Sequence, residues 1–276
     1  MSGFTSRADL INHATVEGRL ESFDFVKSTS NGTLGRWISL WLVGSAPAAG
    51  NSPATTPGNV FSSDQSAQEP GAIWFPDRSP DQRHLLTFGA ISDLDCSVML
   101  YDRLAGVSGI PMNAVGANTI NTQPLTRYAS GAAAELNEVW MEYTTVSSTT
   151  LANLHINLYT TADGSAGQIG GAFNLPSVSV GPNAMIQMPL SPVLRGVQSV
   201  AQITVNTATS GGVTNILIIR PLARIMLPAN EWVEFNFLDD YLNLPRIYDD
   251  ATLGLAVNPL ASLNPVIRGT IQCVYG

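Results

Sequence analysis

The sequence predicts an all-β protein with a β-sandwich or jelly-roll-like body, and three observations support this class. Apolar and polar residues alternate in short segments along the chain, as they do in half-buried strands. Turn pairs rich in glycine and proline separate many of these segments. No internal segment has a convincing helical pattern, while 45% of the residues are apolar, which is enough for a substantial core.

The N-terminal part is predicted to contain a short helix or arm followed by two strands. Residues 1–13 form the helix or arm. Residues 19–26 alternate so that Phe23 and Phe25 share one face, which indicates a half-buried strand. Residues 36–43 form the second strand.

Residues 44–82 differ from their surroundings, because they are rich in Pro, Gly, Ser, Ala and Thr. They are predicted to be a long irregular surface loop or an extended arm. Two explanations for a loop of this length stay open. Either a neighbouring subunit orders it, or it is flexible.

Nine further strands are predicted after this loop. They cover residues 85–91, 97–101, 138–146, 154–160, 184–188, 197–205, 215–219, 231–238 and 266–275. Arg220 and Pro221 are expected to interrupt the apolar run 216–219. We divide the chain into residues 1–96, with the arm, two strands and the loop, and a β-sandwich domain of residues 97–276, unless the two form one continuous domain.

The chain is poor in charge, with 21 acidic and 13 basic residues among 276 and only one lysine, Lys27. Ordinary domains are about a quarter charged. The surface must therefore be covered by uncharged polar residues or by other protein chains. The net charge of −8 and the scattered arginines argue against binding to nucleic acid or to an anionic membrane. The shortage also favours a structural protein over an enzyme.

Targeting signals and disulfides are not expected. Residues 1–10 lack the pattern of a signal peptide, and no segment is apolar enough to span a bilayer. Cys96 and Cys273 are therefore expected to be buried free thiols, although a disulfide between them stays open.

Catalytic motifs are absent from the sequence. It contains no phosphate-binding loop with lysine, no H-E-x-x-H, no G-x-S-x-G and no C-x-x-C. The three histidines, His13, His84 and His155, are far apart, and alternation places His155 opposite Leu154, Ile156 and Leu158 on the solvent side of a strand. We expect no catalytic, cofactor-binding or metal-binding residues.

Carboxylates supply the alternatives to that expectation. Asp93 and Asp95 share a face if their segment is extended. The doublets Asp239-Asp240 and Asp249-Asp250 bracket a loop at residues 239–250 that suits calcium or a glycosidase pair. The simpler interpretation is that these aspartates stabilise turns.

Tryptophans supply a further alternative. Trp37, Trp41, Trp140 and Trp232 are placed in strands and Trp74 at the end of the long loop. Tryptophans in such places are more often buried than used as sugar-binding platforms.

Several segments resemble a recurrent virion structural protein of tailed bacteriophages. They are LYDRL (100–104), WMEYTTV (140–146), NLYTTADGSAG (157–167), GVQSV (196–200) and RPLARIMLP (220–228), together with FTSRADLINHATVEGRLESFDF (4–25) and GRWISLW (35–41). The resemblance covers most of the chain, and its motifs are structural, so it carries over no catalytic residue. It implies a capsid decoration (cement) role.

The expected function is therefore that of a phage head protein that binds the major capsid protein and itself, as a homotrimer or homodimer. It would be made in the host cytoplasm and lie on the virion surface, without nucleic acid or membrane as a partner. A tail, fibre, receptor-binding or carbohydrate-binding β-domain is the alternative. A major shell subunit suits the sequence less well, because no stretch supplies a long helix.

Overall fold

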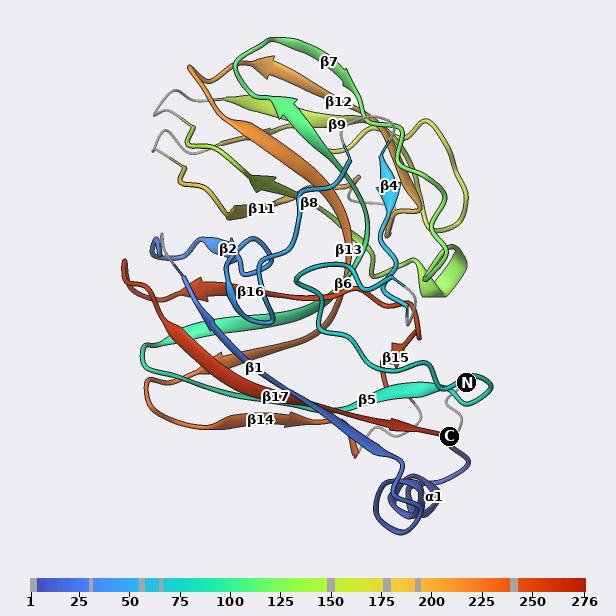
Figure 1. The fold of residues 1–276 in the computed structure, drawn as a ribbon. Helices are drawn as coiled ribbons and strands as arrows, with labels where there is room; N and C mark the ends of the chain where they lie inside the picture. Colours follow the sequence, from blue (N-terminus) through green and yellow to red (C-terminus); the bar gives the residue numbers. More distant parts are fainter. Residues whose placement is uncertain are drawn as a thin grey trace.

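The computed structural model describes residues 4–29, 32–54, 58–64, 67–147, 152–175, 180–191, 195–238 and 243–276. It confirms the all-β prediction, since strands dominate and the helical segments are short. Figure 1 shows three groups of strands, with the four-stranded sheet at the top, a six-stranded sheet at the bottom and a third sheet between them.

The six-stranded sheet joins the two ends of the chain. Its order is β14-β5-β17-β1-β3, with β15 also paired to β5. The strands are β1 (Leu20–Ser28), β3 (Ser45–Ala46), β5 (Arg83–Ser92), β14 (Val233–Asn236), β15 (Arg246–Ile247) and β17 (Val266–Tyr275). The antiparallel pairing of β1 with β17 links residues from both sides of the expected 96/97 boundary.

The central sheet closes on itself. Its order is β13-β8-β11-β2-β16-β6-β4, and β13 also pairs with β6. The strands are β2 (Trp37–Ser39), β4 (Asn59–Val60), β6 (Cys96–Pro111), β8 (Glu138–Tyr143), β11 (Ala184–Met188), β13 (Val213–Leu227) and β16 (Leu253–Pro259). We call the ring formed by β13, β8, β11, β2, β16 and β6 the closed sheet.

The four-stranded sheet has the order β10-β9-β12-β7. Its strands are β7 (Gly116–Thr119), β9 (Asn153–Thr160), β10 (Phe173–Asn174) and β12 (Ser199–Thr207). The helical segments are α1 (Arg7–Ile11), η1 (Asn12–Val16) and η2 (Gly131–Ala133). The Ser6 hydroxyl caps α1 by accepting from Asp9 N, and Leu10 of α1 packs with Val274 of β17.

Two apolar clusters lie on opposite faces of the closed sheet. In β8, Val139 and Met141 face the main core between the sheets, whereas Trp140 faces the interior of the ring with Met99, Tyr101 and Leu217. All the residues of β8 from Val139 to Tyr143 are buried, because both of its faces are covered. A strand of this kind shows no simple alternation of apolar and polar residues.

The long loop is irregular, as expected, but its described parts are ordered by the chain's own body. Phe61, Ile73 and Phe75 are buried. Phe61 N donates to Leu104 O at 2.9 Å, and Ile73 N donates to Leu253 O at 2.9 Å. The described parts are therefore held against the body of the same chain, an arrangement that neither of the two explanations from the sequence included. The buried apolar residues of this segment are few and far apart along the chain. The overall composition of the segment therefore does not predict that it packs against the body. We call residues 44–82 the strap.

Several strand boundaries differ from prediction. The second strand ends at Ser39 rather than at residue 43, and the chain turns there as the Ser39 hydroxyl accepts from Trp41 N at 3.2 Å. β13 continues through Arg220 and Pro221. Its pairing with β8 ends at Ile219, so Pro221 removes no bond on that edge, and a register shift follows it on the β6 side.

Candidate interaction surface

One face of the six-stranded sheet is exposed to solvent. Opposite residues of antiparallel neighbours point to the same side of a sheet, so the registers define this surface, which we call the open face. Its residues are Ser22, Asp24, Val26, Thr87, Gly89, Ile91, Glu234, Asn236, Arg268, Thr270 and Gln272, of which Thr87 and Gly89 are buried. The opposite face carries the buried Phe25, Phe88 and Ile271.

The open face is mostly uncharged. Asp24, Glu234 and Arg268 are its charged residues, and all three side chains are exposed. Arg268 has no ion-pair partner among the described residues. Uncharged side chains supply the rest, including the aliphatic Val26 and the polar Gln272, whose amide oxygen accepts from the Thr87 hydroxyl at 3.1 Å. The face is therefore suited to contact with another surface of low charge.

Trp232 adds an aromatic side chain at the edge of this face. It is 50% exposed and precedes β14. A Cβ at Gly89 would lie 2.6 Å from the Trp232 ring, so only glycine lets the ring lie this close to β5. The prediction that Trp232 lies in a strand is wrong, because pairing begins at Val233, where the chain joins β5.

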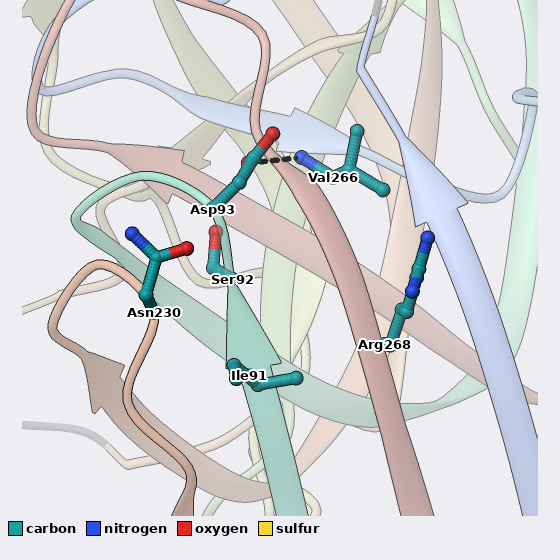
Figure 2. Close-up of a pocket in the computed structure, with 6 residues that line it drawn as sticks. All are labelled: Ile91, Ser92, Asp93, Asn230, Val266 and Arg268. Carbon is teal, nitrogen blue, oxygen red and sulfur yellow. Dashed lines mark hydrogen bonds between the residues drawn. The ribbon is translucent and has the colours of Figure 1, made fainter.

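A shallow hollow of about 290 Å³ lies at one end of the open face. Figure 2 shows its lining residues, Ile91, Ser92, Asp93, Asn230, Val266 and Arg268. Asp93 Oδ1 accepts from Val266 N at 2.7 Å, and Ser92 Oγ accepts from Leu94 N at 3.2 Å. Both acceptors are thus occupied by backbone groups, and the lining contains no histidine or cysteine. The aspartate and serine of this hollow therefore stabilise the turn between β5 and β6.

A second exposed face, on the four-stranded sheet, is rich in amides. Asn153 Nδ2 donates to Asn174 Oδ1 at 2.8 Å, and Asn206 Nδ2 donates to Asn153 Oδ1 at 2.6 Å. The Asn206 amide also contacts His155 Nδ1 at 3.1 Å. His155 therefore lies on the outer side of β9, as predicted. Leu158 is also exposed, contrary to prediction, because a register shift between β9 and β12 disturbs the alternation there.

Several charged residues are buried in ion pairs inside the molecule. Arg103 and Glu142 are fully buried in the closed sheet, with their charged atoms 3.4 Å apart. Asn215 Nδ2 donates to Glu142 Oε2 at 2.7 Å, and the Arg103 guanidinium lies 4.6 Å from the centre of the Trp41 ring and 4.7 Å from that of Phe61. Removing one partner of such a pair leaves an uncompensated buried charge, so we assign the pair to stability.

A second buried cluster ties the strap to the closed sheet. Arg127 donates to both carboxylate oxygens of Asp102, at 2.9 and 3.0 Å, and to Phe61 O at 2.7 Å. It also donates to Asp250 Oδ2 at 3.1 Å. The sequence does not indicate these pairs, because the partners are far apart along the chain.

Lys27 holds the start of the strap. Its Nζ donates to Val43 O and Pro47 O at 2.7 Å each and to Ala48 O at 3.4 Å. Burial lowers the pKa of Lys27 to about 8. The only lysine of the chain therefore fixes the start of the strap through hydrogen bonds, and its side chain is buried.

Only the second aspartate doublet of the loop at residues 239–250 can be placed in the structure. Asp239 and Asp240 lie outside the described residues. Asp249 Oδ1 accepts from Arg83 Nη1 at 3.0 Å, while Asp250 pairs with Arg127. Both are occupied by arginines, which argues against calcium or a glycosidase pair at these two residues. Within the described ranges, no group of three or more His, Cys, Asp or Glu residues is placed to hold a metal ion.

Asp93 and Asp95 do not share a face, because their segment is the turn between β5 and β6. Asp95 Oδ1 accepts from Ala229 N at 2.7 Å, whereas Asp93 binds Val266 N. Each carboxylate therefore satisfies the backbone of a different segment, which is the turn role of aspartate.

The remaining predicted residues are mostly buried. Trp41 and Trp140 are buried, and Trp74 and Trp37 are partly buried. Cys96 and Cys273 are buried free thiols, which confirms the preferred prediction. Burial raises the pKa of both thiols. In the part of the chain that the structure describes, no helix is long and apolar enough to cross a membrane.

Comparisons with known proteins give no family. No family model and no curated protein matches the chain. Among solved structures, a chain in the structure of infectious bursal disease virus, Gt strain, is 10% identical to this chain, with a TM-score of 0.18. The match covers 93% of this chain and 80% of the viral chain. The VP2 subviral particle of the same virus is 7% identical, with a TM-score of 0.19 and coverage of 93% and 79%. The VP1 pentamer of human polyomavirus 6 is 9% identical, with a TM-score of 0.13 and coverage of 93% and 96%. TM-scores of this size do not establish a shared fold.

Proposed function

We propose that this chain is a structural protein of a bacteriophage virion that decorates the capsid and stabilises it by binding the major capsid subunits. The observation that carries the proposal is the open face, with few charges and the half-exposed Trp232 at its edge. Docking such a face takes few ions out of water, so its desolvation cost is small. Tryptophan is among the residues that most often anchor protein interfaces.

The rest of the surface supports the same role. The amide-rich face of the four-stranded sheet also avoids charge, while several arginines are used in buried pairs. The resemblance of the sequence to virion structural proteins of tailed phages points in the same direction. A decoration protein that binds the assembled shell and not its separate subunits stabilises the shell by mass action.

The test is to locate the chain in particles and to measure its effect on heads. Particles that carry the chain are separated into heads and tails, and we expect mass spectrometry to find it in the heads. Heads that lack it are expected to release DNA at a lower temperature, and adding the purified chain is expected to restore the wild-type temperature. Recovery on tails alone would contradict the proposal and support the tail or fibre alternative.

A matched pair of variants tests the open face itself. Trp232→Ala is expected to weaken binding of the chain to heads by about thirtyfold, the effect of losing an interface anchor worth about 2 kcal/mol. Leu158→Ala is the control, because Leu158 is 39% exposed but lies on the four-stranded sheet. Equal binding by both variants would exclude Trp232 as an anchor.

A further inference from the structure

The free edge of β1 carries unpaired main-chain groups. Tyr275 N donates to Arg19 O at 3.2 Å, and Thr29 N donates to Pro265 O at 3.3 Å, in the register of the β1–β17 pair. In an antiparallel pair, residues that exchange hydrogen bonds alternate with residues that do not. The odd-numbered residues of β1 therefore direct their N–H and C=O groups toward β17, and the even-numbered residues direct theirs away from it.

Only part of that outward edge is used within the chain. β3 pairs with β1 at Val26 and Lys27. Among the described residues, no backbone hydrogen bond reaches the outward groups of Leu20, Ser22 or Asp24. The side chains of these three residues are exposed. An edge of this kind is a template for a further strand.

We infer that a second copy of this chain pairs with this edge, through an antiparallel contact between the two β1 strands about a two-fold axis at Ser22. In this register Ser22 lies opposite Ser22 of the second copy, and Leu20 lies opposite Asp24. The contact is self-complementary, as a two-fold interface requires. The two sheets become one continuous sheet.

The sequence of β1 selects this register. The register centred on Ser22 uses all three outward residues, whereas a shift by two residues in either direction leaves one of them without a partner. It also keeps Asp24 away from Asp24 of the second copy, so no like charges lie opposite each other. Pairing stops after Asp24, because β3 occupies the edge from Val26 onward.

The opposite edge of the sheet is less suitable. In β14, Phe237 N donates to Leu86 O at 2.9 Å, so Glu234 and Asn236 direct their main-chain groups outward. A two-fold contact centred on Glu234 would place like charges opposite each other, which is destabilising, and one centred on Phe235 would pair only Glu234 with Asn236. β14 is also only four residues long.

Disulfide trapping tests the contact in the isolated chain, independently of any binding to capsids. Residues opposite each other in a hydrogen-bonded antiparallel pair have Cα atoms about 5.5 Å apart, a distance that a disulfide spans. Ser22→Cys is therefore expected to give a covalent dimer on mild oxidation. Cys96 and Cys273 are buried and free, so they add no background.

Ser28→Cys is the matched control, since Ser28 is an exposed serine on the same face of β1. In the inferred register it lies roughly 40 Å from its copy, at about 3.3 Å per residue, so we expect no cross-link. Cross-linking of both variants to the same extent, or of neither, would overturn the inference.

Sedimentation gives a second readout. The unmodified chain is expected to be a dimer and Ser22→Pro a monomer with an unchanged circular dichroism spectrum. Proline at residue 22 removes an outward N–H and no bond to β17. Ser22→Thr is expected to remain a dimer. A monomeric unmodified chain at concentrations around 0.1 mM would contradict the proposed pairing, whatever its location in a virion.

Discussion

His84 shows how its surroundings decide the chemistry of a single residue. It is buried in β5 beside the ring of Phe4, with ring centroids 5.4 Å apart. Burial, together with the positive charge of Arg246, lowers the pKa of His84 to about 4. Lys27 is a comparable case. The composition shows that it is the only lysine, but only the structure shows that three carbonyl groups enclose it.

His84 gives a prediction for stability against pH. The unfolded chain binds a proton at His84 near pH 6.5, and the folded chain does so only near pH 4. This contribution to stability is present above pH 6.5 and is lost as the pH falls toward 4. The loss is on the order of 2 kcal/mol between pH 7 and pH 5.

Urea unfolding at the two pH values measures this loss. Between pH 7 and pH 5, the His84→Gln variant is expected to lose about 2 kcal/mol less stability than the unmodified chain. His155→Gln, on the exposed side of β9, is the matched control. An unchanged pH dependence in His84→Gln would contradict the assignment.

Among the elements, the strap also depends on surroundings that are distant in the sequence. Its irregular character could be predicted from composition, but its place on the closed sheet depends on single residues. Phe61 contacts Trp41 edge to face, with ring centroids 6.3 Å apart, and its carbonyl accepts from Arg127. β16 was missed in the sequence although all but one of its residues are buried. A strand covered on both faces lacks the alternation that identifies an exposed strand.

Phe61→Ala is expected to destabilise the chain by about 3–5 kcal/mol, because it removes a buried aromatic side chain and leaves a cavity beneath Arg103. Ser62→Ala is the control, since Ser62 is the exposed neighbour in the same segment. Chemical denaturation measures both variants. A change below 1 kcal/mol in Phe61→Ala would show that the strap contributes little to the fold.

In the whole molecule, strands that are far apart in the sequence pair to form the sheets. β1 and β17 lie at opposite ends of the chain and pair over nine residues from Leu20↔Val274 to Ser28↔Val266. β6 and β13 close the central sheet although more than a hundred residues separate their starts. Cys96 in β6 and Cys273 in β17 are buried in the main core that these sheets enclose. Access to both thiols therefore requires the sheets to separate.

We expect both thiols to react with a thiol reagent only as the chain unfolds, at rates set by global unfolding. In the native state, neither is exposed, and burial raises the pKa of both, which disfavours the reactive thiolate. Mass spectrometry after timed labelling counts the modified cysteines. Rapid labelling of one thiol under native conditions would show local opening of its strand.

The all-β class and most strand positions could be predicted from the sequence, and a short N-terminal helix and free thiols were among the alternatives it left open. Alternation, turn chemistry and composition are local properties, so they can be read from neighbouring residues. The register, the closure of the central sheet, the buried Arg103–Glu142 pair and the open face beside Trp232 became visible only in the folded chain. These features depend on which strands lie side by side, and that is set by packing between residues far apart in the chain.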